Sequence, residues 1–312
     1  MNDTTDLVAR QTLADVIGRL LIAPPSAQLW AEAVALPELA TVMTDQPASL
    51  AVAYEQTFGR NVYPYESLYR DEELMLNTAA AEQVAAFYAS CGFTPLQTVG
   101  APDHLGVEFI FLARLIATEA AAIADGDSGL QHWAHQHAAS FLGNHLVIWV
   151  PVWAQAVQRI PGHALYQTLA TLAVEFIESE LERLQPSPPS SRAYIPLQTD
   201  DASPETDDLN TLVRHLITPV RAGIFFSRAD CSQLARRLGF SILIGDRFTM
   251  MRTLFETAGE FDQAAGLIVA LQEIISAETH KLSLLIDGQA AWQPFLAPWI
   301  ERLECSQRLI ST

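Results

Sequence analysis

Apolar residues recur every three to four positions along most of the chain, and this helical spacing constrains the fold more than any other feature. It places each apolar set on one face of a helix, which must be buried against other helices. No stretch shows the sustained alternation of apolar and polar residues typical of a half-buried β-strand. We therefore predict an all-α protein. The clearest stripes are Val84, Phe87, Tyr88 and Cys91; Leu105, Phe109, Leu112 and Ile116; and Leu165, Leu169, Leu172 and Phe176.

One segment near the middle of the chain interrupts this periodicity. Residues 186–206 are rich in proline and acid, and such a composition cannot bury a core. We interpret the segment as an exposed linker. The sequence then divides into a helical domain over residues 1–185 and a smaller helical region over residues 207–312. The sequence of the second region does not indicate its function.

The charge is strongly acidic and unevenly distributed. Of 36 acidic and 18 basic residues, residues 1–185 carry 21 acidic and seven basic ones. This balance argues against a nucleic-acid partner, because affinity for phosphates is mostly cationic. The first 185 residues would attract a cationic ligand instead. High solubility would explain the same charge equally well.

The cysteines and the apolar runs indicate a soluble, cytoplasmic protein. The three cysteines lie far apart and form neither a disulfide framework nor a CxxC site, so we expect reduced core thiols. Residues 1–10 are polar and acidic, unlike a secretory signal. The longest apolar run, Phe109 to Ala124, is broken by Arg114 and Glu119, so no membrane insertion is expected.

Three tyrosines close together form the first candidate site. Tyr63, Tyr65 and Tyr69 flank Pro64, which prevents a regular helix from starting before Tyr65. Tyrosines offer rigid apolar area with a polar tip, which suits a peptide groove. A loop packed onto the core is the alternative explanation.

A second cluster begins at Pro102. Asp103 directly precedes an apolar-periodic stretch, so we expect it to cap the helix N-terminus. His104 falls in the first turn, and Glu108 follows one turn later. Capping alone explains Asp103. The functional interpretation is an acidic rim that receives an arginine side chain through bidentate contacts.

The third cluster combines histidine and tryptophan. Trp149 and Trp153 are one turn apart, so they share a helix face, and His145 precedes them. Tryptophans on a buried helix more often belong to the core than to a ligand site. Both interpretations are retained for Trp149.

Two other functions have partial support in the sequence. A metal-dependent hydrolase could use four histidines, but these show no HExxH pattern and no ligand set at metal-binding spacing. A DNA-binding regulator could use residues 207–312, where residues 231–239 resemble the first helix of a helix-turn-helix. No nucleotide-binding or nucleophile motif occurs. The histidines are His132, His135, His137 and His145.

Four segments, in order, resemble the TorD/DmsD family of redox-enzyme maturation chaperones. The resemblance covers roughly residues 1–185, and residues 207–312 look like the extra helical region of long members. The matching segments are Tyr65-x-Ser67-x-Tyr69; Pro102-Asp103-His104-Leu105 with Glu108; Phe141 through His145 to Trp149-x-Pro151; and Leu165 through Leu172 with Phe176.

This resemblance implies a TorD-like helical bundle plus a smaller C-terminal helical region. It also implies a chaperone function. Such a chaperone binds the twin-arginine signal peptide of a molybdopterin-dependent oxidoreductase and assists cofactor insertion before export. It is not an enzyme and holds no cofactor itself. A negatively charged, aromatic-lined cleft shared by Tyr65, Asp103 and Trp149 is expected. The expected binding residues are Tyr65, Glu66, Ser67, Tyr69, Pro102, Asp103, His104, Glu108, His145 and Trp149.

Within that site, the resemblance implies that His104 and His145 orient the peptide or form hydrogen bonds with it, and that they do not take part in catalysis. The partners implied are the signal peptide and the catalytic subunit of the client enzyme. The oligomeric state stays open between a monomer and a domain-swapped homodimer, since long helices joined by hinges permit exchange.

Overall fold

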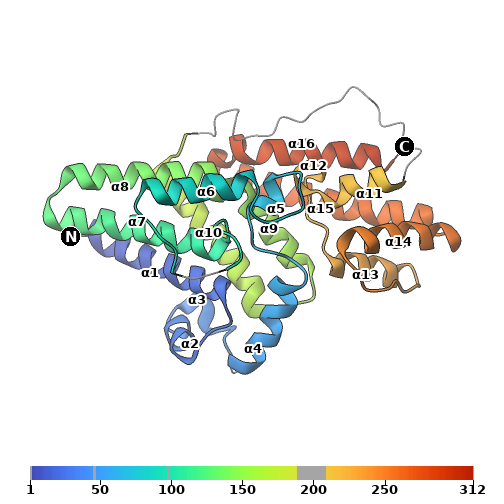
Figure 1. Ribbon diagram of the computed structural model, residues 1–312, viewed down its shortest axis with the longest axis horizontal. Helices are drawn as coiled ribbons and strands as arrows, with labels where there is room; N and C mark the ends of the chain where they lie inside the picture. Colours follow the sequence, from blue (N-terminus) through green and yellow to red (C-terminus); the bar gives the residue numbers. More distant parts are fainter. Residues whose placement is uncertain (1, 45–46, 97–98, 188–208, 312) are drawn as a thin grey trace.

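The protein is an elongated assembly of helices, seen along its length in Figure 1. The computed structural model describes residues 2–44, 47–96, 99–187 and 209–311. Within these ranges the regular structure is helical, and the only β-type pairing is a single bridge between Tyr65 and His104. The all-α prediction is confirmed.

Long helices form the bundle at the N-terminal end. Helix α7 is its centre, because it packs against both α1 and α8 and buries residues on nearly every side. No helix in the described ranges combines the length and apolarity needed to cross a bilayer. The bundle helices are α1 (Asn2–Ile22), α7 (Leu105–Asp125), α8 (Ser128–Phe141), the π-helical turn η2 (Leu142–Leu146), α9 (Val147–Arg159) and α10 (Ala164–Leu184).

Two glycines allow α1 and α7 to approach closely. A Cβ atom at Gly106 would lie 2.5 Å from the Gly18 carbonyl oxygen, and one at Gly18 would lie 2.7 Å from the Gly106 carbonyl oxygen. Any larger residue would therefore push the helices apart. This close crossing fixes the start of α7, next to the segment that carries the second sequence cluster.

Shorter helices connect α1 to α7 and pack on the bundle. The Tyr54 hydroxyl donates to the carbonyl oxygens of Leu21 and Ile22, which ties this part to the end of α1. The connecting elements are α2 (Ala27–Val34), α3 (Pro37–Ala40), α4 (Pro47–Tyr54), the π-helical turn η1 (Glu55–Gly59), α5 (Ser67–Arg70) and α6 (Ala79–Ser90).

The C-terminal region packs directly against the bundle and continues its hydrophobic core. Trp299 donates its indole N–H to the Ile148 carbonyl oxygen at 2.5 Å, in the first turn of α9. Of the predicted linker, only residues 186 and 187 lie within the described ranges. The helices of the region are α11 (Leu209–Ile217), α12 (Pro219–Ala222), α13 (Arg228–Arg237), α14 (Arg247–Glu260), α15 (Ala264–Gly288), the 3₁₀ turn η3 (Ala290–Trp292) and α16 (Gln293–Leu309).

A buried arginine joins the two parts. Arg159, at the end of α9, lies 2.8 Å from a carboxylate oxygen of Glu278 and 3.3 Å from one of Asp230. Burial alone would lower the pKa of Arg159, but the carboxylates of Glu278 and Asp230 outweigh it and raise that pKa. All three side chains are nearly inaccessible, so this charge cluster links α9 to α13 and α15 inside the protein.

Candidate functional site

The first and second sequence clusters meet at a short crossing of two chain segments. The backbone N–H of Leu105 donates to the Pro64 carbonyl oxygen at 2.8 Å, and that of Glu66 donates to the Asp103 carbonyl oxygen at 3.0 Å. Proline has no N–H to offer a helix, so the chain stays extended here until α5 begins at Ser67. The crossing holds the tyrosine segment against the start of α7.

The predicted capping role of Asp103 is wrong. Its carboxylate accepts from the Ser67 backbone N–H at 2.7 Å, across to α5. The N-cap of α7 is His104, whose Nδ1 accepts from the Gly106 N–H at 3.0 Å. Burial lowers the pKa of His104 to about 4, so its ring is neutral and can accept this bond near neutral pH.

A buried ion cluster lies beneath this crossing. Glu66 is wholly buried and pairs with Arg70, one turn later in α5, and with His145 Nδ1 at 3.0 Å. Burial alone would raise the pKa of Glu66, but His145 and Arg70 outweigh it and lower that pKa. Arg70 also donates to the Asn144 carbonyl oxygen at 3.0 Å. The cluster therefore connects α5 to the π-helical turn η2.

Glu108 lies in the same buried group. Its side chain is wholly buried in α7. Burial, together with the carboxylates of Glu66 and Asp103, holds its pKa well above the usual range. The neutral form of Glu108 is therefore favoured, which reduces the negative charge beside Glu66 and Asp103.

Glu108 should make stability depend on pH. The folded state holds its proton above pH 4.5, where the unfolded chain releases it, so stability falls as pH rises through this range. Glu108→Gln removes the effect. We expect the stability of this variant relative to the parent to increase with pH, by at most about 1.4 kcal/mol per pH unit. Urea unfolding of both proteins from pH 5 to 8 measures it; a difference that is constant with pH would refute it.

Tyr69 of the first cluster and both tryptophans of the third cluster belong to the core. The Tyr69 ring centroid lies 5.0 Å from that of Trp149 and 5.1 Å from that of Phe225, and all three side chains are inaccessible. Trp153 is equally buried and stacks on Phe58. Tyr69 and Trp149 therefore belong to the core beneath the tyrosine segment and do not form part of its surface.

The histidines do not converge. His135 contacts Glu119 at 2.9 Å, His137 contacts its own helix at the Trp133 carbonyl oxygen, and His145 contacts Glu66. In the part of the chain that the structure describes, no three histidine, cysteine or carboxylate side chains are grouped to hold a metal ion. The hydrolase alternative therefore finds no support in the geometry.

The DNA-binding alternative also lacks the expected geometry. Helix α13 ends at Arg237 and α14 begins at Arg247, so residues 238–246 separate them. A helix-turn-helix joins its helices with a turn of about three or four residues. In addition, Arg237 pairs with Glu273 at 2.6 Å. The resemblance to a helix-turn-helix is therefore a similarity in sequence alone, and the arrangement of α13 and α14 does not reproduce that motif.

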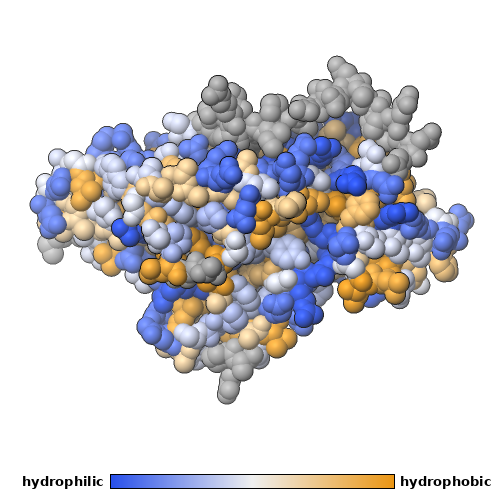
Figure 2. Space-filling model, in the orientation of Figure 1, coloured by the Kyte–Doolittle hydropathy of each residue, from blue (hydrophilic) through white to orange (hydrophobic). Residues whose placement is uncertain are grey.

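An open pocket of about 530 Å³ lies over the tyrosine segment, between α5 and the C-terminal helices. Figure 2 shows apolar side chains gathered with hydrophilic ones on this face. One wall comes from residues 63–76 and the other from residues 217–248. The first wall contains Tyr63, Tyr65, Leu68, Leu74 and Leu76; the second contains Ile217, Arg228, Asp246, Arg247 and Phe248.

The pocket differs from the expected cleft. Tyr65 lines it, but Asp103 and Trp149 are fully buried and do not, so the cleft expected between these three residues is not seen. Among the ten expected binding residues only Tyr65 and Pro102 are partly exposed. Among the polar members, Glu66 pairs with His145, and Asp103 accepts from the Ser67 backbone N–H, where α5, α7 and η2 meet.

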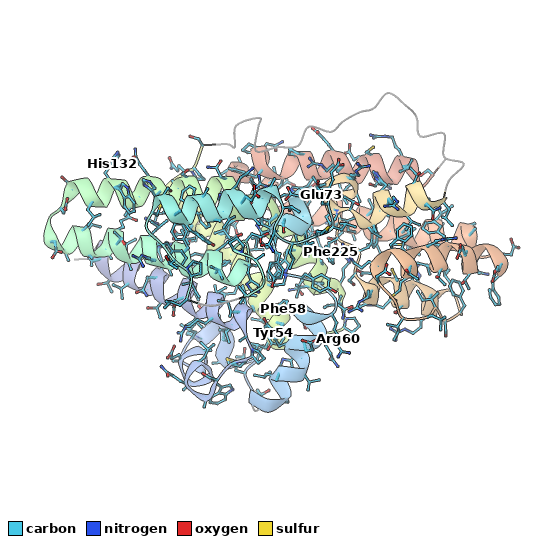
Figure 3. All side chains as sticks on the ribbon, in the orientation of Figure 1. Tyr54, Phe58, Arg60, Glu73, His132 and Phe225 are labelled. Atoms are coloured by element: carbon cyan, nitrogen blue, oxygen red, sulfur yellow. The ribbon has the colours of Figure 1, made fainter. Side chains whose placement is uncertain are left out.

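Most residues that line the pocket were not predicted from the sequence. Leu74 and Leu76 are each 37% exposed, and Met75 between them is 68% exposed. Exposed apolar residues in series mark interaction sites. The available signal was this apolar triplet directly after the acids Asp71, Glu72 and Glu73. Figure 3 labels Glu73 beside this wall and Phe225 in the adjoining core.

Comparison with known proteins finds one matching protein family and several curated relatives. Residues 25–155 match the protein family described as "Nitrate reductase delta subunit". The chain is 33% identical over 118 residues to "Chaperone protein TorD" of Vibrio cholerae serotype O1, which covers 38% of this chain and 52% of that protein. It is 28% identical over 119 residues to "Chaperone protein TorD" of Vibrio parahaemolyticus serotype O3:K6, covering 36% and 52%. The chain thus spans about half the length of these curated relatives.

Proposed function

We propose that the chain is a member of the TorD/DmsD family of redox-enzyme maturation chaperones, to which it is similar, and that it binds the twin-arginine signal peptide of a molybdopterin-dependent oxidoreductase. It acts in the cytoplasm without catalytic activity. By covering the signal, it delays export of the catalytic subunit until the cofactor is inserted.

The pocket beside the family's tyrosine segment is the observation that carries this proposal. Its first wall is made of tyrosine and leucine side chains and is open to solvent. Extended apolar peptides bind in such grooves, where aromatic side chains supply contact area at little entropic cost. The apolar part of a signal peptide has the matching chemistry.

The acids divide into two groups with different tasks. Glu66 and Asp103 are buried, so they position the tyrosine segment from beneath: one anchors α5 to η2, the other anchors it to the start of α7. Glu73 is exposed and directly precedes Leu74 of the pocket wall. We assign the first guanidinium contact of the peptide to Glu73, in an N-terminal part whose excess negative charge attracts cations.

A double substitution in the pocket wall tests the proposal. Leu74→Asp combined with Leu76→Asp places charge where the apolar segment binds, so we expect at least about tenfold weaker binding, in line with the loss of two apolar contacts. Isothermal titration calorimetry with a synthetic twin-arginine peptide measures it.

Leu96→Asp is the matched control. Leu96 is 93% exposed and lies outside the pocket, so this substitution adds negative charge elsewhere and should leave affinity unchanged. Equal affinity of the parent, the double variant and the control would remove the pocket from the binding site.

A further inference from the structure

One arginine on the second wall of the pocket, Arg247, and one beside that wall, Arg214, are not neutralised by carboxylates within the described ranges. Arg247 lies 4.2 Å from the Phe225 ring centroid and donates to the Phe226 carbonyl oxygen at 3.3 Å. Arg214 lies over Phe248, a pocket residue, at 5.2 Å. Within the described ranges neither guanidinium has a carboxylate within salt-bridge distance.

The chain has twice as many acids as bases, so most arginines could find a carboxylate. Several in the described structure do, as Arg10 pairs with Glu180, Arg183 with Glu119, and Arg252 with Glu256. The pocket carboxylate, Asp246, is already engaged, because it caps α14 by accepting from the Thr249 N–H at 2.9 Å. Arg247, on the second wall, and Arg214, which lies over Phe248, are therefore available to a carboxylate of a partner.

Burial affects Arg247 in particular. Loss of solvent lowers its pKa below the usual value, and only the weak influences of Tyr69, Tyr63 and Cys231 oppose this. A carboxylate in the pocket would offset that cost with a charge-assisted hydrogen bond. The planar guanidinium, held against Phe225, is suited to a bidentate carboxylate contact.

The loop before α14 carries two further exposed apolar side chains. Leu243 and Ile244 are 85% and 87% exposed, and they lie just before Asp246 and Arg247 in the sequence. A peptide can offer apolar side chains as well as a carboxylate, which is the chemistry that these exposed apolar residues and Arg247 together would recognise. The surface thus fits a peptide.

We propose that the C-terminal region completes the binding site and selects a peptide whose apolar segment is followed by a carboxylate side chain, which pairs with Arg247. This inference rests on the proposed function and extends it. The N-terminal wall binds the apolar segment and the cationic end of the peptide, while Arg247 in the C-terminal wall binds its carboxylate. Residues 209–311 thereby contribute to client selection.

Two peptides that differ in one atom group test the inference. Both carry paired arginines and an apolar segment, followed by glutamate in one and glutamine in the other. The parent protein should bind the glutamate peptide about tenfold more tightly, as for one charge-assisted contact. Arg247→Gln should abolish the preference, and Arg247→Lys should keep part of it. Calorimetry gives each affinity.

Two further variants make the result specific. Arg214→Gln, at an exposed position, should reduce the preference about threefold if it adds a second, solvent-screened attraction. Arg236→Gln is the control, because Arg236 is exposed on α13, outside the pocket, and donates to the Ser232 carbonyl oxygen. It should leave the preference intact. Equal binding of both peptides by the parent, or a preference that survives Arg247→Gln, would overturn the inference.

The proposed function and this inference fail in different ways. If twin-arginine dependence is absent but the glutamate preference depends on Arg247, the inference stands and the signal-peptide assignment falls. If millimolar inorganic phosphate binds in an Arg247-dependent manner while the two peptides bind equally, the site is one for phosphate, and the peptide carboxylate is ruled out.

Discussion

Replacing Glu66 by alanine is expected to lower the free energy of unfolding by about 3–5 kcal/mol, the usual cost of removing one member of a buried ion pair. Glu66 is inaccessible, and its carboxylate is the partner of both Arg70 and His145. The substitution leaves a guanidinium that is only 8% exposed without this carboxylate. Urea denaturation at pH 7 measures the loss.

A second pair with the same sequence spacing provides the control. Arg252 and Glu256 are also four residues apart in a helix, but both side chains are about half exposed. Glu256→Ala should therefore cost only about 0.3–0.5 kcal/mol. Similar losses in the two variants would show that burial does not give Glu66 its importance.

Replacing Arg159 by alanine should be about as severe, again about 3–5 kcal/mol. The two carboxylates of Asp230 and Glu278 are 4% and 3% exposed, and both lose their contact with this cation. Because Arg159 lies on α9 and its partners on α13 and α15, the loss should weaken the attachment of the C-terminal region. Limited proteolysis should then cut that region first.

The control for this substitution is Arg237→Ala. Arg237 pairs with Glu273, with both side chains about half exposed, so we expect a loss below about 1 kcal/mol and unchanged proteolysis. Uniform cleavage of the Arg159→Ala variant along the whole chain would contradict the claim that Arg159 attaches the C-terminal region to the bundle.

The fold class followed from the sequence because helical spacing is a local property. The stripe from Leu105 to Ile116 lies in α7, as its period requires. The role of Asp103 could not follow, because its partner Ser67 is 36 residues away in the sequence. A capping residue and a residue that bonds a distant backbone look alike before a helix.

The candidate site was only partly predictable for the same reason. The sequence placed Tyr65, Glu66, Glu108 and His145 in matching segments, and the structure brings these segments together. Which of them face solvent depends on how α5, α7 and η2 meet. The first pocket wall ends at Leu76, whereas the second is built from the C-terminal region, so no local pattern joins the two.

Calorimetric titration with a twin-arginine peptide tests the central claim most directly. The protein should bind a peptide with paired arginines and an apolar segment saturably, and replacing both arginines by glutamine should weaken binding about tenfold, as for loss of charge-assisted contacts. Absence of binding, or equal affinity for the two peptides, would contradict the assignment.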